Sequence, residues 1–81
     1  MTPLGAREMV WVEGLGRGGA PSGFTWRGRR HSVRQVEGWR EAGGSLRVYR
    51  IRTAGGMRCL ISLDPGRSVW RMERVLPPKE G

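Results

Sequence analysis

Arginine is the residue type with the greatest chemical potential in this sequence, and it is concentrated beside aromatic residues. The segment FTWRGRRHSV, residues 24–33, carries Arg27, Arg29 and Arg30 together with two aromatic residues and His31. A guanidinium group binds phosphate oxygens through a planar fork of donors, and it also stacks on nucleobases. The segment therefore has two interpretations: a hairpin that binds nucleic acid, or an ordinary turn whose strands are basic.

The overall charge favours a polyanionic partner. The chain has a formal net charge of +8, and Lys79 is the only lysine among its 15 lysine and arginine residues. The high ratio of arginine to lysine is also typical of a GC-rich genome, but such a coding bias does not account for the net charge. A surplus of this size on a small domain is typical of proteins that bind DNA or RNA.

Few residues in the chain could catalyse a reaction. His31 could act as a general base only beside a suitable acid or nucleophile, and its predicted neighbour is Trp26. Cys59 is predicted to lie on the inner face of a sheet as a small apolar residue. One cysteine and one histidine cannot form a Cys/His zinc site within one chain, and the 7 acidic residues are scattered. We expect no enzyme activity, small-molecule substrate, cofactor or metal site.

The length and composition indicate one small domain. Within a single domain of residues 1–81, we expect a core over 7–76, a flexible glycine-rich loop over 14–23 and a frayed tail over 77–81. No apolar run approaches the length of a membrane span, and the N-terminus lacks the features of a signal peptide. The cytoplasm is therefore the expected location, away from membranes.

The apolar residues alternate at strand spacing, and glycine and proline interrupt the chain at short intervals. This pattern predicts an all-β fold of about five or six antiparallel strands, the first of them over residues 7–13. The strands are expected to curl into a small SH3-like or partly open barrel.

The first predicted hairpin has a two-residue turn at Gly28-Arg29, which sets Arg27 opposite Arg30 and Trp26 opposite His31. This register predicts an inner face of Phe24, Trp26, His31 and Val33. A bulge near Arg34 to Gln35 would bring Val36 back into phase, and Gly38 permits a bend before Trp39. We expect Trp39 to be partly exposed, whereas Trp26 and Trp70 are expected in the core.

The second predicted hairpin has a three-residue loop, Ala54-Gly55-Gly56. That loop length keeps the apolar residues on one face, pairing Ile51 with Cys59 and Tyr49 with Ile61, and it points Arg52 and Arg58 outward. The sequence DPGR at residues 64–67 predicts the next turn. A pairing of Leu63 with Ser68 then sets Trp70 opposite Ile61, Met72 opposite Cys59 and Glu73 opposite Arg58.

Four segments have a distinctive order and spacing: FTWRGRRHSV, VEGWRE, VYRIRTAGGMRCLISLD and VWRMERV. Over residues 24–75 they resemble a small uncharacterised bacterial domain with W-R-G-R, W-R, Y/F-R-V and W-x-L-x-R-V elements. His31 stands where that pattern has an aromatic residue. The domain occurs alone or as a C-terminal appendage of some proteins related to Y-family translesion polymerases. The resemblance implies a link to DNA repair or damage tolerance, and it transfers no catalytic residue.

We therefore predict a non-catalytic accessory domain that binds nucleic acid, DNA in preference to RNA, in DNA repair or replication. Its arginine-rich sheet face and hairpin tip would contact phosphates. The alternative is a protein-interaction module that docks on a polymerase or another acidic partner. A continuous basic face favours the first function, whereas arginines among acids beside an exposed apolar patch favour the second. The candidate binding residues are Arg27, Arg29, Arg30, Arg34, Trp39, Arg50, Arg52, Arg58 and Arg71.

Overall fold

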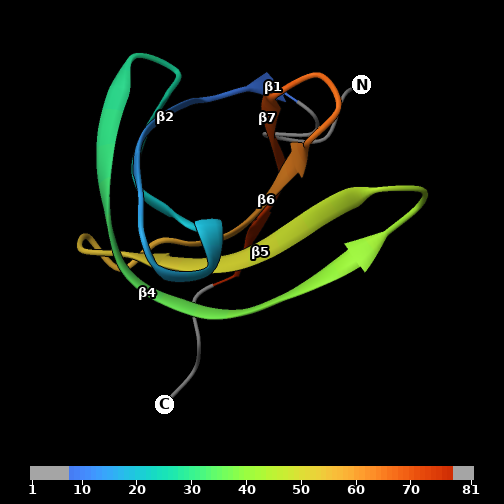
Figure 1. The fold of residues 1–81 in the computed structure, drawn as a ribbon. Coiled ribbons are helices and arrows are strands. Elements are labelled where there is room, and N and C mark those ends of the chain that lie inside the picture. The colour runs from blue at the N-terminus through green and yellow to red at the C-terminus, as the bar shows by residue number, and fades with distance from the viewer. Residues whose placement is uncertain (1–7, 78–81) are drawn as a thin grey trace.

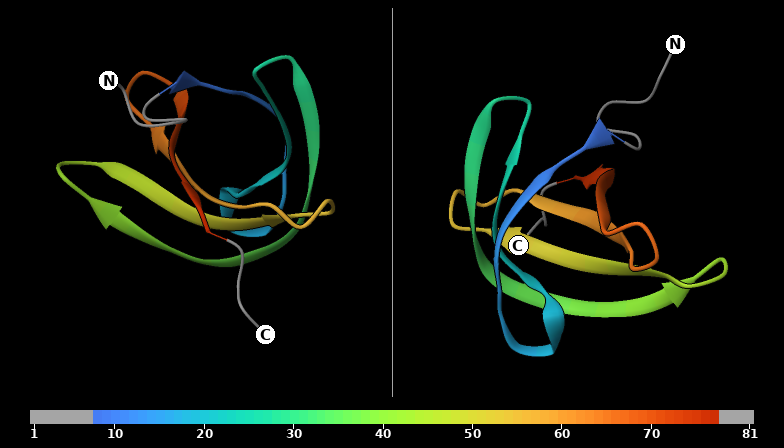
Figure 2. Two further views of the ribbon diagram at one scale, coloured as in Figure 1. Left: turned by 180° about the vertical axis from the view of Figure 1, so that it is seen from behind. Right: turned by 45° about the horizontal axis from the view of Figure 1, so that its top comes forward.

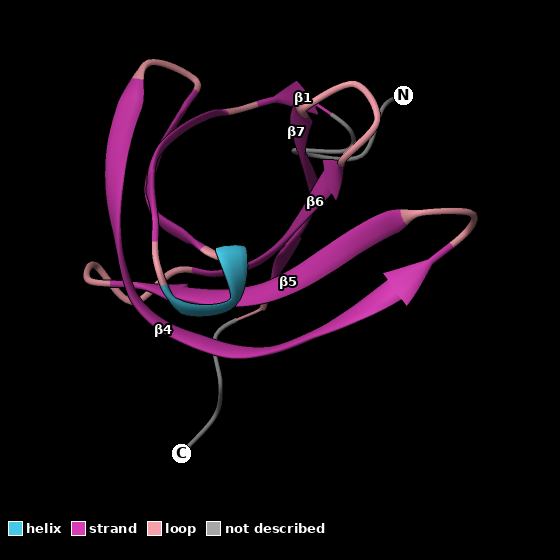
Figure 3. Cartoon of the chain, viewed as in Figure 1, coloured by secondary structure: helices cyan, strands magenta, loops and turns pink. Residues whose placement is uncertain are grey.

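The structure is a computed structural model that describes residues 8–77. This part of the chain is all-β, apart from one short 3-10 turn, η1, at Arg17–Gly19 (Figures 1 and 3). No helical segment within residues 8–77 has the length and apolar character that crossing a membrane requires. The strands are β1 (Glu8–Met9), β2 (Trp11–Leu15), β3 (Pro21–Trp26), β4 (Arg29–Ala42), β5 (Leu46–Thr53), β6 (Arg58–Asp64) and β7 (Val69–Leu76).

All seven strands form one antiparallel sheet in the order β1-β7-β6-β5-β4-β3-β2. The two outermost strands, β1 and β2, are separated in sequence only by Val10, so the sheet curls until its two edges meet at this residue (Figure 2). The amide of Val10 donates to the carbonyl of Trp70 in β7, at 3.0 Å. The strand predicted over residues 7–13 is therefore divided, because it pairs first with β7 and then with β3. This division raises the count above the predicted five or six strands.

The core lies inside the curl and is built from alternate residues of the strands. Phe24, Ile51, Cys59, Ile61 and Met72 are fully buried there. Val10, Ala20, Trp26 and Tyr49 complete this buried cluster. The predicted inner face of the β5–β6–β7 meander is thus largely confirmed, except that Trp70 is only half-buried.

The β3–β4 hairpin differs from the prediction in its turn. The turn residues are Arg27 and Gly28, with φ of 52° and 76°, and positive φ at both positions is the mark of a type I′ turn. Trp26 therefore pairs with Arg29 and Phe24 with His31, so the predicted opposition of Arg27 to Arg30 is wrong. The predicted inner face survives, because the two registers differ by an even number of residues.

The longest strand, β4, belongs to both sides of the curl. Its first part pairs with β3, and its second part pairs with β5 from Val33 onward. The register shifts between Val33 and Gln35, which confirms the predicted bulge, and shifts again between Val36 and Gly38. Each bulge adds local twist, so the strand can bend around the core.

The β5–β6 hairpin has the predicted register, with Tyr49 opposite Ile61 and Ile51 opposite Cys59. Its three-residue loop is closed by the amide of Thr53, which donates to the carbonyl of Met57 at 2.8 Å.

The β6–β7 hairpin departs from its prediction. Asp64 pairs with Val69 and Leu63 with Trp70, so the turn is formed by residues 65–68. The register then shifts between Leu60 and Ile61, because Glu73 forms a bulge between Met72 and Arg74. Glu73 consequently does not face Arg58, and its carboxylate accepts a hydrogen bond from Ser62 at 2.6 Å.

The segment predicted as a flexible loop over 14–23 is shorter in the structure. β2 extends to Leu15, β3 begins at Pro21, and η1 lies between them. The hydroxyl of Tyr49 lies 3.5 Å from the carbonyl oxygen of Gly18, so η1 covers one end of the core. The predicted tail lies outside the described residues except for Pro77, which is exposed.

Candidate nucleic-acid interface

The largest group of arginines lies on the outer face of β4–β7. Tyr49, Ile51 and Thr53 of β5 are buried, so the alternate residues Arg50 and Arg52 point outward. The cross-strand register carries this face to the neighbouring strands. Arg52 pairs with Arg58, Val48 with Arg40, Ser62 with Arg71 and Leu60 with Arg74. We call this surface the basic face; its arginines are Arg40, Arg50, Arg52, Arg58, Arg71 and Arg74.

Three acidic residues accompany the basic face, and each is engaged. Glu37 pairs with Arg58, with 3.3 Å between its Oε1 and Nη2 of the arginine. Glu73 accepts the hydroxyl of Ser62. Asp64 Oδ1 accepts the backbone amide of Gly66 at 3.1 Å and so stabilises the turn. These local engagements leave the positive charge of the face in excess.

Several guanidinium groups of the basic face remain available to a ligand. Arg52 is held by Gln35, whose Oε1 lies 2.5 Å from Nη2 of the arginine. Within residues 8–77, the structure gives Arg40, Arg50 and Arg74 no hydrogen-bond or ion-pair partner, and all three are exposed. Exposed guanidinium groups with free donors can bind phosphate oxygens at little desolvation cost.

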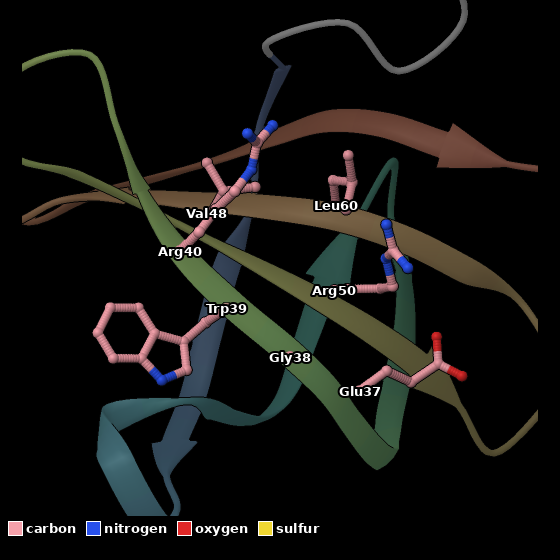
Figure 4. A pocket seen from close by; sticks show the side chains of 7 residues that line it. All are labelled: Glu37, Gly38, Trp39, Arg40, Val48, Arg50 and Leu60. Carbon is pink, nitrogen blue, oxygen red and sulfur yellow. The ribbon is translucent and has the colours of Figure 1, made fainter.

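A shallow pocket of about 240 Å³ lies within the basic face (Figure 4). Arg40 and Arg50 project on the same side of the sheet as Val48 and Leu60, whereas the side chain of Trp39 points away from them. The pocket thus combines apolar groups with two cations. Its lining residues are Glu37, Gly38, Trp39, Arg40, Val48, Arg50 and Leu60.

The hairpin-tip arginines lie on a different wall, formed by β2, β3 and the first part of β4. Arg27 donates to Glu8 through Nε at 2.8 Å and also forms an ion pair with it. Its guanidinium carbon lies 4.8 Å from the ring centroid of Trp26. Arg30 forms a second ion pair, with 2.9 Å between its Nε and Oε2 of Glu13. Arg29 is exposed at the tip.

The other two candidates are also separate from the basic face as defined. Arg34 is exposed and lies at the first bulge of β4, between Val33 and Gln35. Trp39 is 55% exposed, as predicted, but it pairs with the buried Tyr49, with 6.3 Å between their ring centroids. The guanidinium carbon of Arg47 lies 5.5 Å from the Trp39 ring centroid. The structure therefore gathers Arg50, Arg52, Arg58 and Arg71 on the basic face, and it places Arg27, Arg29, Arg30 and Arg34 elsewhere. Trp39 borders the pocket, but its side chain points away from the arginines.

Sequence reasoning missed Arg40, Arg74 and the pocket. The face on which Arg40 lies depends on the second β4 bulge, and that of Arg74 depends on the bulge at Glu73. The bulge at Glu73 has no local sequence signal, and Gly38 indicated a bend beside the second β4 bulge but not the change of register. The pocket did have a sequence signal at Val48 and Leu60. Each is an apolar residue at an outward position of a strand whose register was predicted correctly.

Neither Cys59 nor His31 lies on the basic face. Burial raises the pKa of the Cys59 thiol to about 12, so the thiol stays protonated at neutral pH and packs as an apolar group. His31 is half-buried and stacks on Phe24, with 5.1 Å between ring centroids. Burial lowers the pKa of His31, and the positive charge of Arg29 lowers it further.

The lowered pKa of His31 predicts that the fold loses stability in mild acid. The pKa of His31 in the folded protein lies below the ordinary histidine value of 6.5, so near that pH the unfolded chain binds more protons than the folded chain. The free energy of unfolding should therefore fall as the pH drops below about 6.5 and level off below the folded pKa. Urea denaturation between about pH 7.5 and 5.5 measures this, above the range where carboxylates titrate. A His31→Gln variant should lack the dependence; an equal dependence in both proteins would contradict the assignment.

Comparison with known proteins leaves the chain without an assigned family. No protein-family model matches it, and no curated protein or solved structure does so either.

Proposed function

We propose that this protein is a non-catalytic nucleic-acid-binding domain that contacts phosphates through the basic face. The observation that carries the proposal is the gathering of six arginines on one face of four adjacent strands. Three of them, Arg40, Arg50 and Arg74, are exposed and have no partner among residues 8–77. Arginines opposite one another in a sheet repel, so their concentration on one face favours an anionic ligand.

The binding should depend on charge more than on base sequence. Contacts to phosphates position a nucleic acid without reading its sequence, whereas sequence readout needs groups that reach base edges. We further propose that the curled sheet is a small SH3-like barrel. The preference for DNA, the role in DNA repair or replication and the cytoplasmic location rest on the sequence alone.

A salt titration of the wild-type protein tests the proposal. Fluorescence anisotropy with labelled single-stranded and double-stranded DNA and RNA should give micromolar or tighter binding at low salt. The logarithm of the association constant should fall linearly with the logarithm of the salt concentration. Three to six phosphate contacts predict slopes of roughly −2 to −4 on single strands, at about −0.7 per contact. Absence of binding at low salt would refute the proposed function.

A second candidate function, docking on another protein, is favoured by a different surface. Met9, Trp11 and Leu15 are 59%, 75% and 64% exposed. Trp11 pairs with Thr25, which pairs with Arg30, so the exposed indole lies in one row with the Arg30–Glu13 ion pair. Exposed apolar groups with paired charges around them are typical of surfaces that bind proteins. A polymerase or another acidic partner fits the net charge of +8.

A further inference from the structure

We infer that the pocket between Arg40 and Arg50 holds one unpaired nucleobase, so that the basic face prefers a single strand to a duplex. This inference deepens the proposed function and rests on it. The proposed function needs only phosphate contacts, whereas the inference assigns a binding site for the base itself.

The pocket has the composition of a site for a flat ring beside phosphates. Val48 and Leu60 lie half-buried on the outer face of β5 and β6 amid arginines, and neither belongs to the buried core cluster. Its volume of about 240 Å³ is below the roughly 300–1,000 Å³ of pockets that enclose drug-sized ligands. One ring system is therefore a better fit than a larger molecule.

The two guanidinium groups suit both parts of a nucleotide. Arg40 pairs with Val48 and Arg50 with Leu60, so each cation lies beside an apolar residue of the pocket. A guanidinium plane stacks on a base, and its charge attracts the phosphates that flank that base in the strand. Glu37 also lines the pocket, but its carboxylate is paired with Arg58, which reduces its repulsion of phosphate.

Gly38 keeps the pocket open. It lies opposite Arg50 on the outer face, and a Cβ added at this position would meet no atom within 4 Å. Its φ lies outside the left-handed region, so a larger residue can adopt the same backbone conformation. A valine at this position would therefore project toward the ligand without straining the fold.

The expected preference for a single strand over a duplex follows from the accessibility of the bases. In a duplex the bases are paired and stacked inside, so a protein surface of this kind meets only phosphates and sugars. In a single strand a base can be splayed out onto the protein. Stacking of one base on an aromatic side chain contributes about 1–3 kcal/mol, and we take the lower end of that range, about five-fold in affinity, for a base held by two guanidinium planes and two apolar side chains.

The test compares three probes of equal length: a single strand of about 12 nucleotides, a duplex of the same sequence and an abasic single strand. Wild-type protein should bind the base-containing strand about five-fold more tightly than the abasic strand. The Gly38→Val variant should bind both single strands equally, at the wild-type affinity for the abasic strand. Its affinity for the duplex should be unchanged.

The Gly55→Val variant is the matched control. Gly55 lies in the β5–β6 loop with φ outside the left-handed region, and its added Cβ would meet only Thr53 Oγ1, at 3.9 Å. It should bind all three probes like the wild type. Equal wild-type affinity for the base-containing and abasic strands would overturn the inference and leave the proposed function intact, and so would an equal loss on all probes in Gly38→Val. Binding of no probe by the wild type would overturn both.

Discussion

Replacing Arg40, Arg50 and Arg74 together with glutamine should weaken nucleic-acid binding by roughly ten-fold to a hundred-fold at moderate salt. These three guanidinium groups are exposed and have no partner among residues 8–77, so their donors are available to phosphates. Each lost phosphate contact should also reduce the salt slope on a single strand by about 0.7, or about 2 for all three. Fluorescence anisotropy at several salt concentrations measures both effects.

The control for this variant removes the same number of charges from the surface formed by β2, β3 and the first part of β4. Replacing Arg27, Arg29 and Arg30 with glutamine lowers the net charge equally, but Arg27 and Arg30 are already paired with Glu8 and Glu13. The loss of affinity in this variant, measured as the change in the logarithm of the association constant, should be less than half that of the basic-face variant. Its salt slope should stay close to that of the wild type. A larger loss in the hairpin-tip variant than in the basic-face variant would contradict the location of the interface.

The second large effect concerns stability. A Phe24→Ala substitution should lower the free energy of unfolding by about 3–5 kcal/mol, because Phe24 is fully buried and the deletion leaves a cavity. Trp11→Ala removes a larger ring from the facing strand, but Trp11 is 75% exposed, so the loss should stay within about 0.5 kcal/mol. Urea denaturation followed by fluorescence measures both. Comparable losses in the two variants would contradict the assignment of inner and outer faces on β2 and β3.

The β5–β6 hairpin shows what the sequence determines well. Only the three-residue loop keeps Ile51 and Cys59 on the side of Tyr49 and Ile61, so alternation and loop length agree on one register. At the first hairpin the same reasoning predicted the wrong turn, Gly28-Arg29 in place of Arg27-Gly28. Gly28 satisfies both the first position of a type II′ turn and the second position of a type I′ turn, so the sequence did not distinguish them.

Bulges and long-range pairs account for what the sequence did not predict. The bulge at Glu73 changes the partners of the residues from Arg74 onward, yet no glycine or proline marks it. The ion pairs of Arg27 and Arg30 involve Glu8 and Glu13, which reach the hairpin only because β1 and β2 close the curl. The alternation of inward and outward residues within one hairpin therefore correctly predicted that these arginines point outward. It could not show that acidic residues lie beside them.

The most direct test of the basic face as the interface is its location in solution. Backbone amide chemical shifts of isotope-labelled protein, followed by NMR during titration with a single-stranded oligonucleotide, locate the contact surface residue by residue. The predicted result is a set of saturable shifts concentrated on the second part of β4 and on β5–β7, strongest around Arg40, Val48, Arg50, Leu60 and Arg74. Shifts concentrated at Trp11 and the Arg27–Arg30 hairpin tip, with the basic face unaffected, would contradict it.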